Sequence, residues 1–122
     1  MKISNIILRV EDLARSLEFY RDRLGLTVLG SSEAFAFLDG RGVTLALNAI
    51  GPAIAEHPPG LVEVVFEVDN VVTTCEALAA AGVEFRGDPQ VVMSDGGRDL
   101  VAADFRDPDG NVLSITGWRQ VS

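Results

Sequence analysis

Two carboxylates, Glu63 and Glu67, lie in a segment whose apolar and polar residues alternate. In an extended chain this spacing places both on one face, while Val64 and Phe66 share the other. A carboxylate on a partly buried wall can act as a general base or pair with a cation of a ligand. Residues 61–68 are therefore candidates for chemistry, provided that they form a strand.

Histidine and cysteine chemistry is limited to one residue of each kind. His57 lies beside Pro58 and Pro59, in a context that favours a solvated side chain over a catalytic or ligating one. A single histidine also rules out a histidine-based metal site within one chain. Cys75 lies among Val71 and several alanines, which is typical of a small buried apolar residue rather than a nucleophile.

Three glycine-containing motifs predict turns. The acidic motif DPDG at 107–110 and the motif DGRG at 39–42 are both expected to connect two strands. The motif SDGGR at 94–98 lacks the strand-to-helix context of a phosphate loop, and it predicts a flexible hairpin tip that could cover a binding cleft. Arg98 is then a candidate ligand contact.

Length and charge limit the classes of function. The chain has 122 residues, which suits one domain, and 48% of them are hydrophobic, as in a folded globular protein. Eighteen acidic against ten basic residues give a net charge of -8, so nucleic acid and anionic membranes are not expected as partners, whereas a cationic small ligand would be attracted. The absence of a secretion signal, of a membrane-spanning stretch and of a second cysteine leads us to expect a cytoplasmic protein.

The elements expected to carry these residues occur in the same order twice. Residues 3–10 alternate as a strand, Asp12 can cap a helix over 13–24 that ends at Gly25, and three β-favouring runs follow at 26–30, 34–38 and 43–48. A linker rich in glycine and proline covers 50–60.

The second copy begins at residue 61. A strand over 61–68 precedes a helix that Asp69 or Asn70 can cap and that ends at Gly82. Further β-like runs follow at 83–86, 91–93, 100–105 and 112–116, one of which is expected to be partly loop. Trp118 comes after the last of these runs, where it can stack on a ligand or cover the core.

An internal match supports a duplication. The sequence FLDGRGVTLAL from Phe37 and FRDPDGNVLSI from Phe105 share Phe, Asp, Gly and Leu at the same offsets. We therefore predict a single α+β domain built from two βαβββ modules, residues 1–49 and 61–118, joined by the linker 50–60. One such module alone would leave an apolar sheet face wet, so we expect the two to pack together.

The runs ILRVEDLARSLEFYRDRLGL, VEVVFEVDNV and FRDPDGNVLSI resemble the vicinal oxygen chelate superfamily, which includes glyoxalase I, bleomycin resistance proteins and extradiol dioxygenases. The resemblance covers about residues 3–118. It implies the glyoxalase/bleomycin resistance/dioxygenase fold, in which curled mixed sheets form a ligand cleft that is commonly completed in a homodimer. Whether the modules would pair within one chain or between chains stays open.

The resemblance also identifies four positions that hold a divalent metal in the metal-dependent members. They fall on Asn5, Ala46, Glu63 and Ser114. Only Glu63 is a good ligand, because Ala46 has no donor atom and the other two are weak neutral donors. We therefore expect no metal cofactor.

The same register assigns the cleft walls and these candidate ligand-binding residues: Asn5, Ile7, Arg9, Asn48, Glu63, Glu67 and Ser114. Arg98 of the hairpin tip and Trp118 after the last run complete the set of candidate ligand contacts. This mixture of polar and apolar groups suits an organic ligand of modest size. Glu63 is the candidate general base, and the alternative is a salt bridge to Arg9. Arg9 in turn occupies a position where some glyoxalase-type enzymes hold a substrate carboxylate.

Two main hypotheses for function follow. The first is a metal-independent binding protein similar to the bleomycin resistance type, with an aromatic or cationic small molecule as its ligand. The second is a glyoxalase, isomerase or dioxygenase-type enzyme that uses Glu63 as a base or an atypical metal site. A regulatory or degenerate domain without a ligand is a third alternative.

Overall fold

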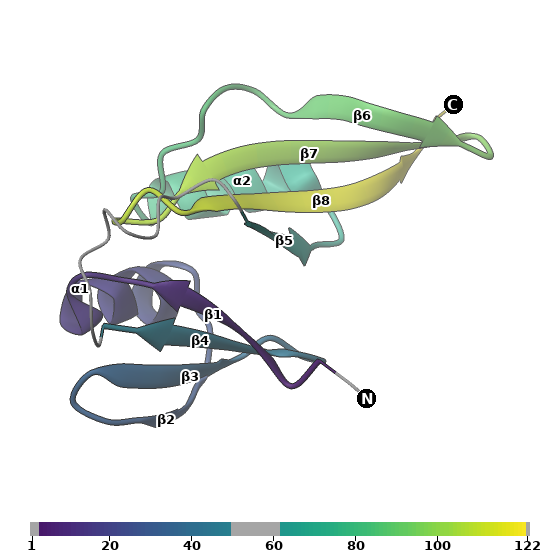
Figure 1. Cartoon of the computed structure of the whole chain (residues 1–122). Helices are drawn as coiled ribbons and strands as arrows, with labels where there is room; N and C mark the ends of the chain where they lie inside the picture. The colour runs from purple at the N-terminus through teal and green to yellow at the C-terminus, as the bar shows by residue number, and fades with distance from the viewer. Residues whose placement is uncertain (1–2, 50–61, 122) are drawn as a thin grey trace. The chain divides into compact units, whose positions relative to one another are not determined.

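The computed structural model describes residues 3–49 and 62–121. The chain divides into two compact units, Met1–Pro59 and Gly60–Ser122, and each is described by itself (Figure 1). The predicted linker 50–60, with His57, lies outside the described residues, and its role stays a prediction. No helix in the described part of the chain is long and apolar enough to cross a membrane.

The first unit is a βαβββ module. Its elements are β1 (Asn5–Arg9), α1 (Leu13–Leu17), the π-helical segment η1 (Glu18–Arg23), β2 (Val28–Ser31), β3 (Phe35–Asp39) and β4 (Thr44–Asn48). The four strands form one mixed sheet in the order β1-β4-β3-β2, with β1 parallel to β4 and the other pairs antiparallel.

The predicted helix over 13–24 is present, but its second half is wider than an α-helix. Asp12 caps the start, where its Oδ1 accepts a hydrogen bond from the backbone N–H of Arg15 at 3.2 Å. Further along, the N–H of Leu24 bonds to the carbonyl of Phe19 five residues back, at 2.9 Å. Gly25 then ends the segment in the left-handed region at φ +80, as predicted.

The second unit repeats this module. Its elements are β5 (Glu63–Glu67), α2 (Val71–Ala80), β6 (Gln90–Asp95), β7 (Arg98–Arg106) and β8 (Val112–Gln120). The sheet order β5-β8-β7-β6, with β5 parallel to β8, matches the order in the first unit strand for strand. The predicted α+β fold of two βαβββ modules with mixed sheets is therefore confirmed, and each sheet is open, with two edge strands.

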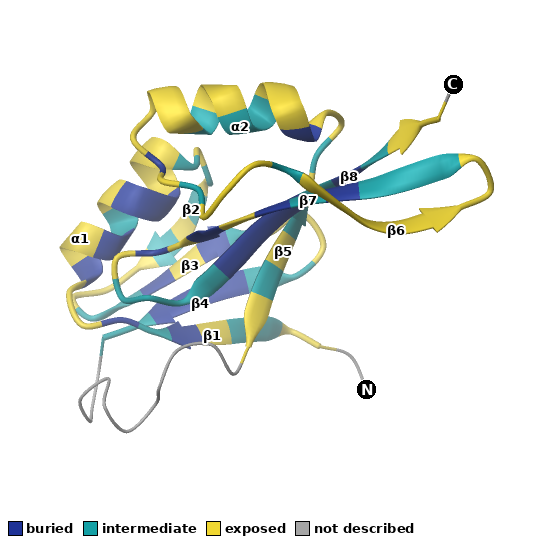
Figure 2. Ribbon diagram, turned by 90° about the horizontal axis from the view of Figure 1, so that it is seen from above, coloured by how far each residue is buried: buried dark blue, intermediate teal, exposed yellow. Residues whose placement is uncertain are grey.

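Helix α2 covers one face of the second sheet. Asn70, and not Asp69, caps it, since the Asn70 Oδ1 accepts from the N–H of Thr73 at 2.9 Å. Gly117 of β8 lies so close to the helix start that a Cβ there would meet the Val68 carbonyl oxygen at 2.6 Å. Most of α2 faces outward, as the exposed residues in Figure 2 show, and Val71 is its one buried residue.

Of the predicted β-like runs, one was expected to be partly loop, and the structure shows that this run is 83–86. This segment contributes only an isolated bridge between Phe85 and Phe105. Gly82 at φ +98 and Gly87 at φ +150 turn the chain on both sides of it, and Pro89 has no N–H to donate to a ladder. Residues 83–86 therefore belong to the connection between α2 and β6.

The predicted hairpin tip at 94–98 is present, between β6 and β7. Only Gly96 and Gly97 form its turn, with φ +59 and +79, and Asp95 pairs directly with Arg98. Two consecutive glycines with positive φ fit the tight hairpin turn that matches strand twist. Trp118 lies within β8 rather than after it, because β8 continues to Gln120.

Candidate functional site

The residues assigned to the cleft wall of the first unit share one face of its sheet. Asn5, Ile7 and Arg9 of β1 are the register partners of Thr44, Ala46 and Asn48 of β4. Successive side chains alternate between faces, so this set lies opposite the face that carries the buried Leu8, Leu45 and Leu47. The predicted grouping of Asn5, Ile7, Arg9 and Asn48 on one face is therefore what the register gives.

The centre of this face is apolar. Ile7, Ala46 and Phe37 form one row across β1, β4 and β3, and Ile7 and Phe37 are 51% and 39% exposed. The Phe37 ring also lies 5.1 Å from that of Phe35, measured between centroids. Polar side chains flank the row, with Asn5 at one end and Arg9 beside Asn48 at the other.

The cleft wall assigned to the second unit likewise lies on the face opposite α2. Gly117 packs against α2, so Ser114, Thr116 and Trp118 point to the other side of β8. Glu63 and Glu67 occupy this face at the two ends of β5, and Arg98 occupies it at the start of β7. The register thus brings five of the predicted residues onto one face: Glu63, Glu67, Arg98, Ser114 and Trp118.

One carboxylate on this face was missed from the sequence. Asp104 of β7 is the register partner of Ser114, whose other neighbour is Val65 of β5. Asp104 is exposed, as are Glu63 and Glu67, whereas Ser114 is only 2% exposed. The alternation along β7 between Leu100 and Arg106 is the signal that could have placed Asp104 here.

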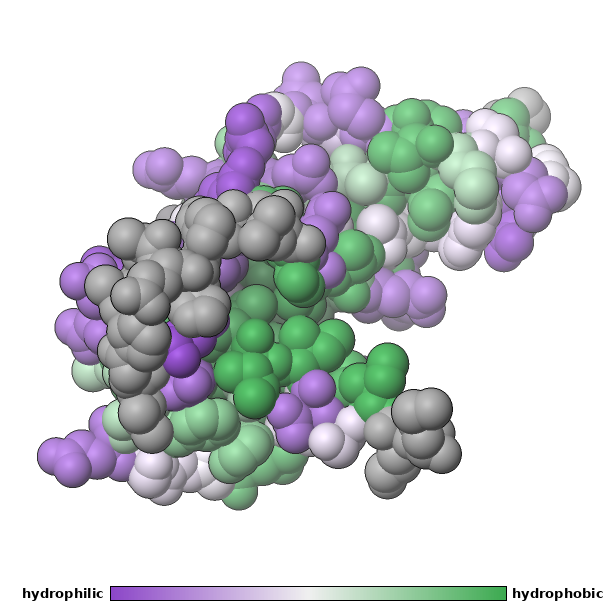
Figure 3. Space-filling model, in the orientation of Figure 1, coloured by the Kyte–Doolittle hydropathy of each residue, from purple (hydrophilic) through white to green (hydrophobic). Residues whose placement is uncertain are grey.

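The far end of the second sheet extends beyond β5. Strands β7 and β8 have nine residues each, whereas β5 reaches only as far as Thr116 of β8. We call the three-stranded part beyond it, residues 91–95, 98–101 and 117–120, the distal hairpin. In the space-filling view hydrophobic residues gather on part of it (Figure 3), and Val92 and Met93 of β6 are 58% and 48% exposed.

A cation stacks on an aromatic ring in the distal hairpin. The guanidinium carbon of Arg98 lies 4.3 Å from the centroid of the Trp118 ring. Leu100 is the register partner of Trp118, and Asp95 is that of Arg98. The structure therefore places two of the candidate ligand contacts, Arg98 and Trp118, against each other.

The four positions equivalent to superfamily metal ligands do not make a fitting donor set. Asn5 and Glu63 begin β1 and β5, and Ala46 and Ser114 occupy the third positions of β4 and β8, so the equivalence holds within each unit. Their donors are one amide, one carboxylate, one hydroxyl and no atom at all. In the described part of the chain, no group of three or more His, Cys, Asp and Glu could hold a metal ion.

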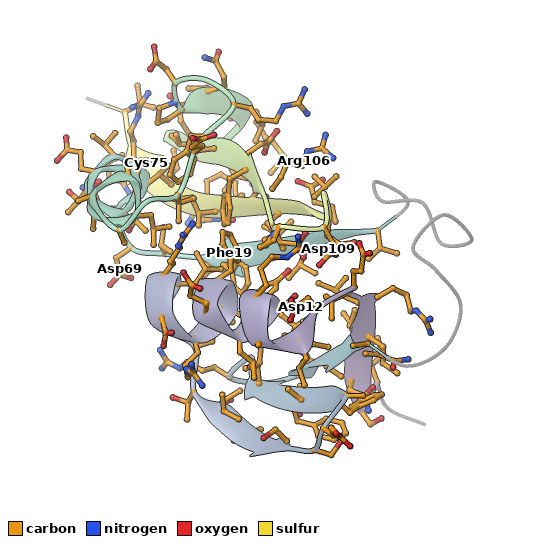
Figure 4. All side chains as sticks on the ribbon, turned by 90° about the vertical axis from the view of Figure 1, so that its left-hand side faces the viewer. Asp12, Phe19, Asp69, Cys75, Arg106 and Asp109 are labelled. Atoms are coloured by element: carbon orange, nitrogen blue, oxygen red, sulfur yellow. The ribbon has the colours of Figure 1, made fainter. Side chains whose placement is uncertain are left out.

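Cys75 does not belong to either wall. It lies on α2, as Figure 4 shows, away from Arg106 and Asp109, which lie at the connection between β7 and β8. The side chain is half-buried rather than fully buried as predicted, because α2 turns most of its surface outward. Partial burial, followed by the charge of Glu76, raises the pKa of the Cys75 thiol. A protonated thiol is a poor nucleophile.

A small hollow of about 140 Å³ lies beside the start of α2, on the helix side of the sheet. Asn70, Val71, Val101 and Gly117 are among the residues that line it. Of the predicted site residues, only Trp118 also borders this hollow. The hollow is therefore separate from the sheet face that carries Glu63 and Glu67.

Comparison with known proteins agrees with this architecture. Residues 2–115 match the Glyoxalase/Bleomycin resistance protein/Dioxygenase superfamily. The chain belongs to this superfamily. The resemblance seen in the sequence is thereby confirmed.

Similar proteins within the superfamily differ in their names. A lactoylglutathione lyase of Haemophilus influenzae is 35% identical over 90% of this chain and 87% of its own length. A metallothiol transferase FosB of Staphylococcus haemolyticus is 46% identical, but over only 38% of this chain and 33% of its own. The crystal structure of a glyoxalase/bleomycin resistance protein/dioxygenase from Nocardioides matches with a TM-score of 0.73 and 27% identity, over 97% of this chain and 83% of that one.

Proposed function

We propose that the chain binds a small organic ligand, aromatic or cationic, without a resident metal ion. The observation that carries this proposal is the gathering of Glu63, Glu67, Ser114, Arg98 and Trp118 on one sheet face. Carboxylates, hydroxyls and a large ring among apolar residues are the groups that orient an organic molecule. The acidic net charge of -8 supports a ligand with positive charge.

The donor set at the four equivalent positions supports the metal-free part of the proposal. Removal of divalent ions by a chelator is expected to leave ligand affinity unchanged. A loss of binding on chelation, restored by one metal, would overturn that part.

The protein is further proposed to act as a cytoplasmic homodimer with no nucleic-acid partner. Superfamily clefts are commonly completed by a second subunit, and the exposed apolar Ile7 and Phe37 are suited to be covered by protein. A single cysteine supports a reducing compartment. Sedimentation equilibrium at micromolar concentration is expected to give twice the 13.0 kDa chain mass, and a monomer would contradict the dimer.

Isothermal titration calorimetry tests ligand binding. Cationic aromatic compounds are expected to give saturable heats that weaken in Glu63→Gln, while Glu84→Gln, a charge-matched change outside both walls, leaves them unaltered. No heat from any cationic compound, together with turnover of a neutral metabolite, would overturn the binding proposal.

A second candidate is an enzyme that uses Glu63 as a general base. The similarity to a lactoylglutathione lyase over most of both chains favours it. Glu63 is exposed on its strand and free to reach a substrate proton at that face. Lactoylglutathione lyase activity, assayed with and without added divalent metal, is expected to be lost in Glu63→Gln, and unchanged turnover in that variant would remove the base.

A further inference from the structure

The Trp118 ring already accepts a cation in this structure. Arg98 is placed over it by the sheet, since Arg98 and Trp118 lie on the same face at diagonal positions of β7 and β8. The electron-rich face of an indole attracts cations, and it is the best aromatic side chain for this purpose. Among the described residues, this stacking is the interaction that the structure gives for the Arg98 side chain.

The Arg98 side chain has a second possible partner, the carboxylate of Asp95. Its register partner across the Gly96–Gly97 turn is Asp95, which is exposed on the neighbouring strand. Directly opposed residues in a hairpin are close enough for their charges to interact. Arg98 can therefore leave Trp118 and pair with the carboxylate of Asp95. The register allows both arrangements, Arg98 stacked on Trp118 and Arg98 paired with Asp95.

The surroundings of Trp118 suit another cation. Glu67 is the register partner of Thr116, and Trp118 lies two residues further on the same face, just beyond the end of β5. On the other side, Leu100 and Met93 continue the row that starts at Trp118, which provides an apolar surface. A ring flanked by one carboxylate and two apolar side chains matches the needs of a cation with an apolar body.

We propose that the Trp118 face covered by Arg98 is a binding site for an organic ammonium ion, and that Arg98 is its displaceable internal occupant. The proposal rests on the proposed function and deepens it, because it names the class of ligand and the aromatic ring, that of Trp118, on which the ligand's charge binds. A quaternary ammonium fits best, because it has no N–H group that would need a hydrogen-bond acceptor. On binding, Arg98 moves from the ring of Trp118 to Asp95.

If the ligand displaces Arg98, removal of the Arg98 side chain should raise the affinity for the ligand instead of lowering it. A ligand that competes with an internal occupant binds with an affinity reduced by the fraction of molecules in which the ring is free. Arg98→Ala is therefore expected to tighten ammonium binding by about two- to fivefold, the range for an exposed cation–aromatic contact. Glu67→Gln is expected to weaken it, because the ring loses its neighbouring carboxylate.

Trp118 is the one tryptophan of the chain, so its fluorescence reports this site alone. Benzyltrimethylammonium is the probe, benzoate is its anionic counterpart, and both are titrated into the full chain. Arg119→Ala is the matched control, since it removes the same charge from the same strand region but on the opposite face, where Arg119 lies 3.8 Å from Asp99. We expect a saturable change with the ammonium probe, tighter in Arg98→Ala, weaker in Glu67→Gln and unaltered in Arg119→Ala.

Three results would overturn the proposal. They are binding of benzoate in preference to the ammonium probe, equal or weaker ammonium binding in Arg98→Ala, and equal tightening in Arg119→Ala, which would reduce the effect to net charge. Calorimetry on the same samples separates this failure from that of the proposed function. Saturable heat from other organic compounds without a Trp118 response overturns the ammonium site alone, whereas no heat from any compound overturns both.

Discussion

The Oδ2 atom of Asp107 accepts a hydrogen bond from the side-chain amide of Asn111 at 2.8 Å. Its Oδ1 atom accepts two more, from the backbone N–H groups of Asp109 at 2.9 Å and Asn111 at 2.8 Å. Asp107 is 5% exposed, so its carboxylate relies on these three hydrogen bonds rather than on water. The acidic motif at 107–110 is thus a turn held by its first carboxylate.

Asp107→Ala is expected to lower the free energy of unfolding by about 2–4 kcal/mol, because the half-buried Asp109 and Asn111 lose the acceptor of three hydrogen bonds. Urea denaturation followed by circular dichroism measures this loss. Asp39→Ala is the control in the equivalent turn, where the carboxylate accepts a backbone hydrogen bond from Arg41 and is more exposed. Its cost is expected near 0.5–1 kcal/mol, and equal costs at both positions would contradict the assignment.

Gly117→Ala is expected to destabilise the second unit by about 1–3 kcal/mol. The added Cβ would meet the Val68 carbonyl oxygen at 2.6 Å and the Val71 Cγ2 at 3.2 Å, which forces β8 away from the start of α2. Thermal unfolding reports the change. Gly30→Ala, where a Cβ meets nothing within 4 Å, is the control, and it is expected to stay within about 0.5 kcal/mol of the parent.

The repeated fold was predictable where a strand alternates between exposed and more buried residues, as β5 and the second half of β7 do. In β5, Val64 and Phe66 are half-buried while Glu63 and Glu67 are exposed, as the pattern predicts. The ends of elements were less predictable, because they depend on neighbours rather than on the local pattern. Residues 83–86 have β-favouring side chains, yet the glycines on both sides deny them a partner strand.

The members of each candidate wall were also predictable, since a period of two assigns faces once a strand is identified. Contacts across strands were not, because they need the register of a hairpin. The stacking of Arg98 on Trp118 depends on the register of β7 with β8, which pairs Leu100 with Trp118 and so places Arg98 diagonally across from the ring. Asp104 is different, since the alternation along β7 could have assigned its face, and the register adds that its partner there is Ser114.

Asn70→Ala is expected to cost about 1 kcal/mol, the usual effect of removing a helix N-cap. The Asn70 Oδ1 satisfies the N–H of Thr73, which has no partner within the helix. Asp69→Ala is the matched control, since the sequence allowed either residue as the cap. Its effect on urea denaturation is expected to be under about 0.5 kcal/mol, and a larger loss than in Asn70→Ala would reverse the assignment.

Alkylation of Cys75 is expected to need a higher pH in the folded chain than in urea. Partial burial and the charge of Glu76 raise the pKa of the thiol, so at any given pH a smaller fraction is the reactive thiolate. Iodoacetamide labelling followed by mass spectrometry gives the rate against pH. Glu76→Gln is expected to move the folded profile toward lower pH, and Glu84→Gln to leave it in place. Coincident profiles for folded and unfolded chains would show that burial has no effect on Cys75.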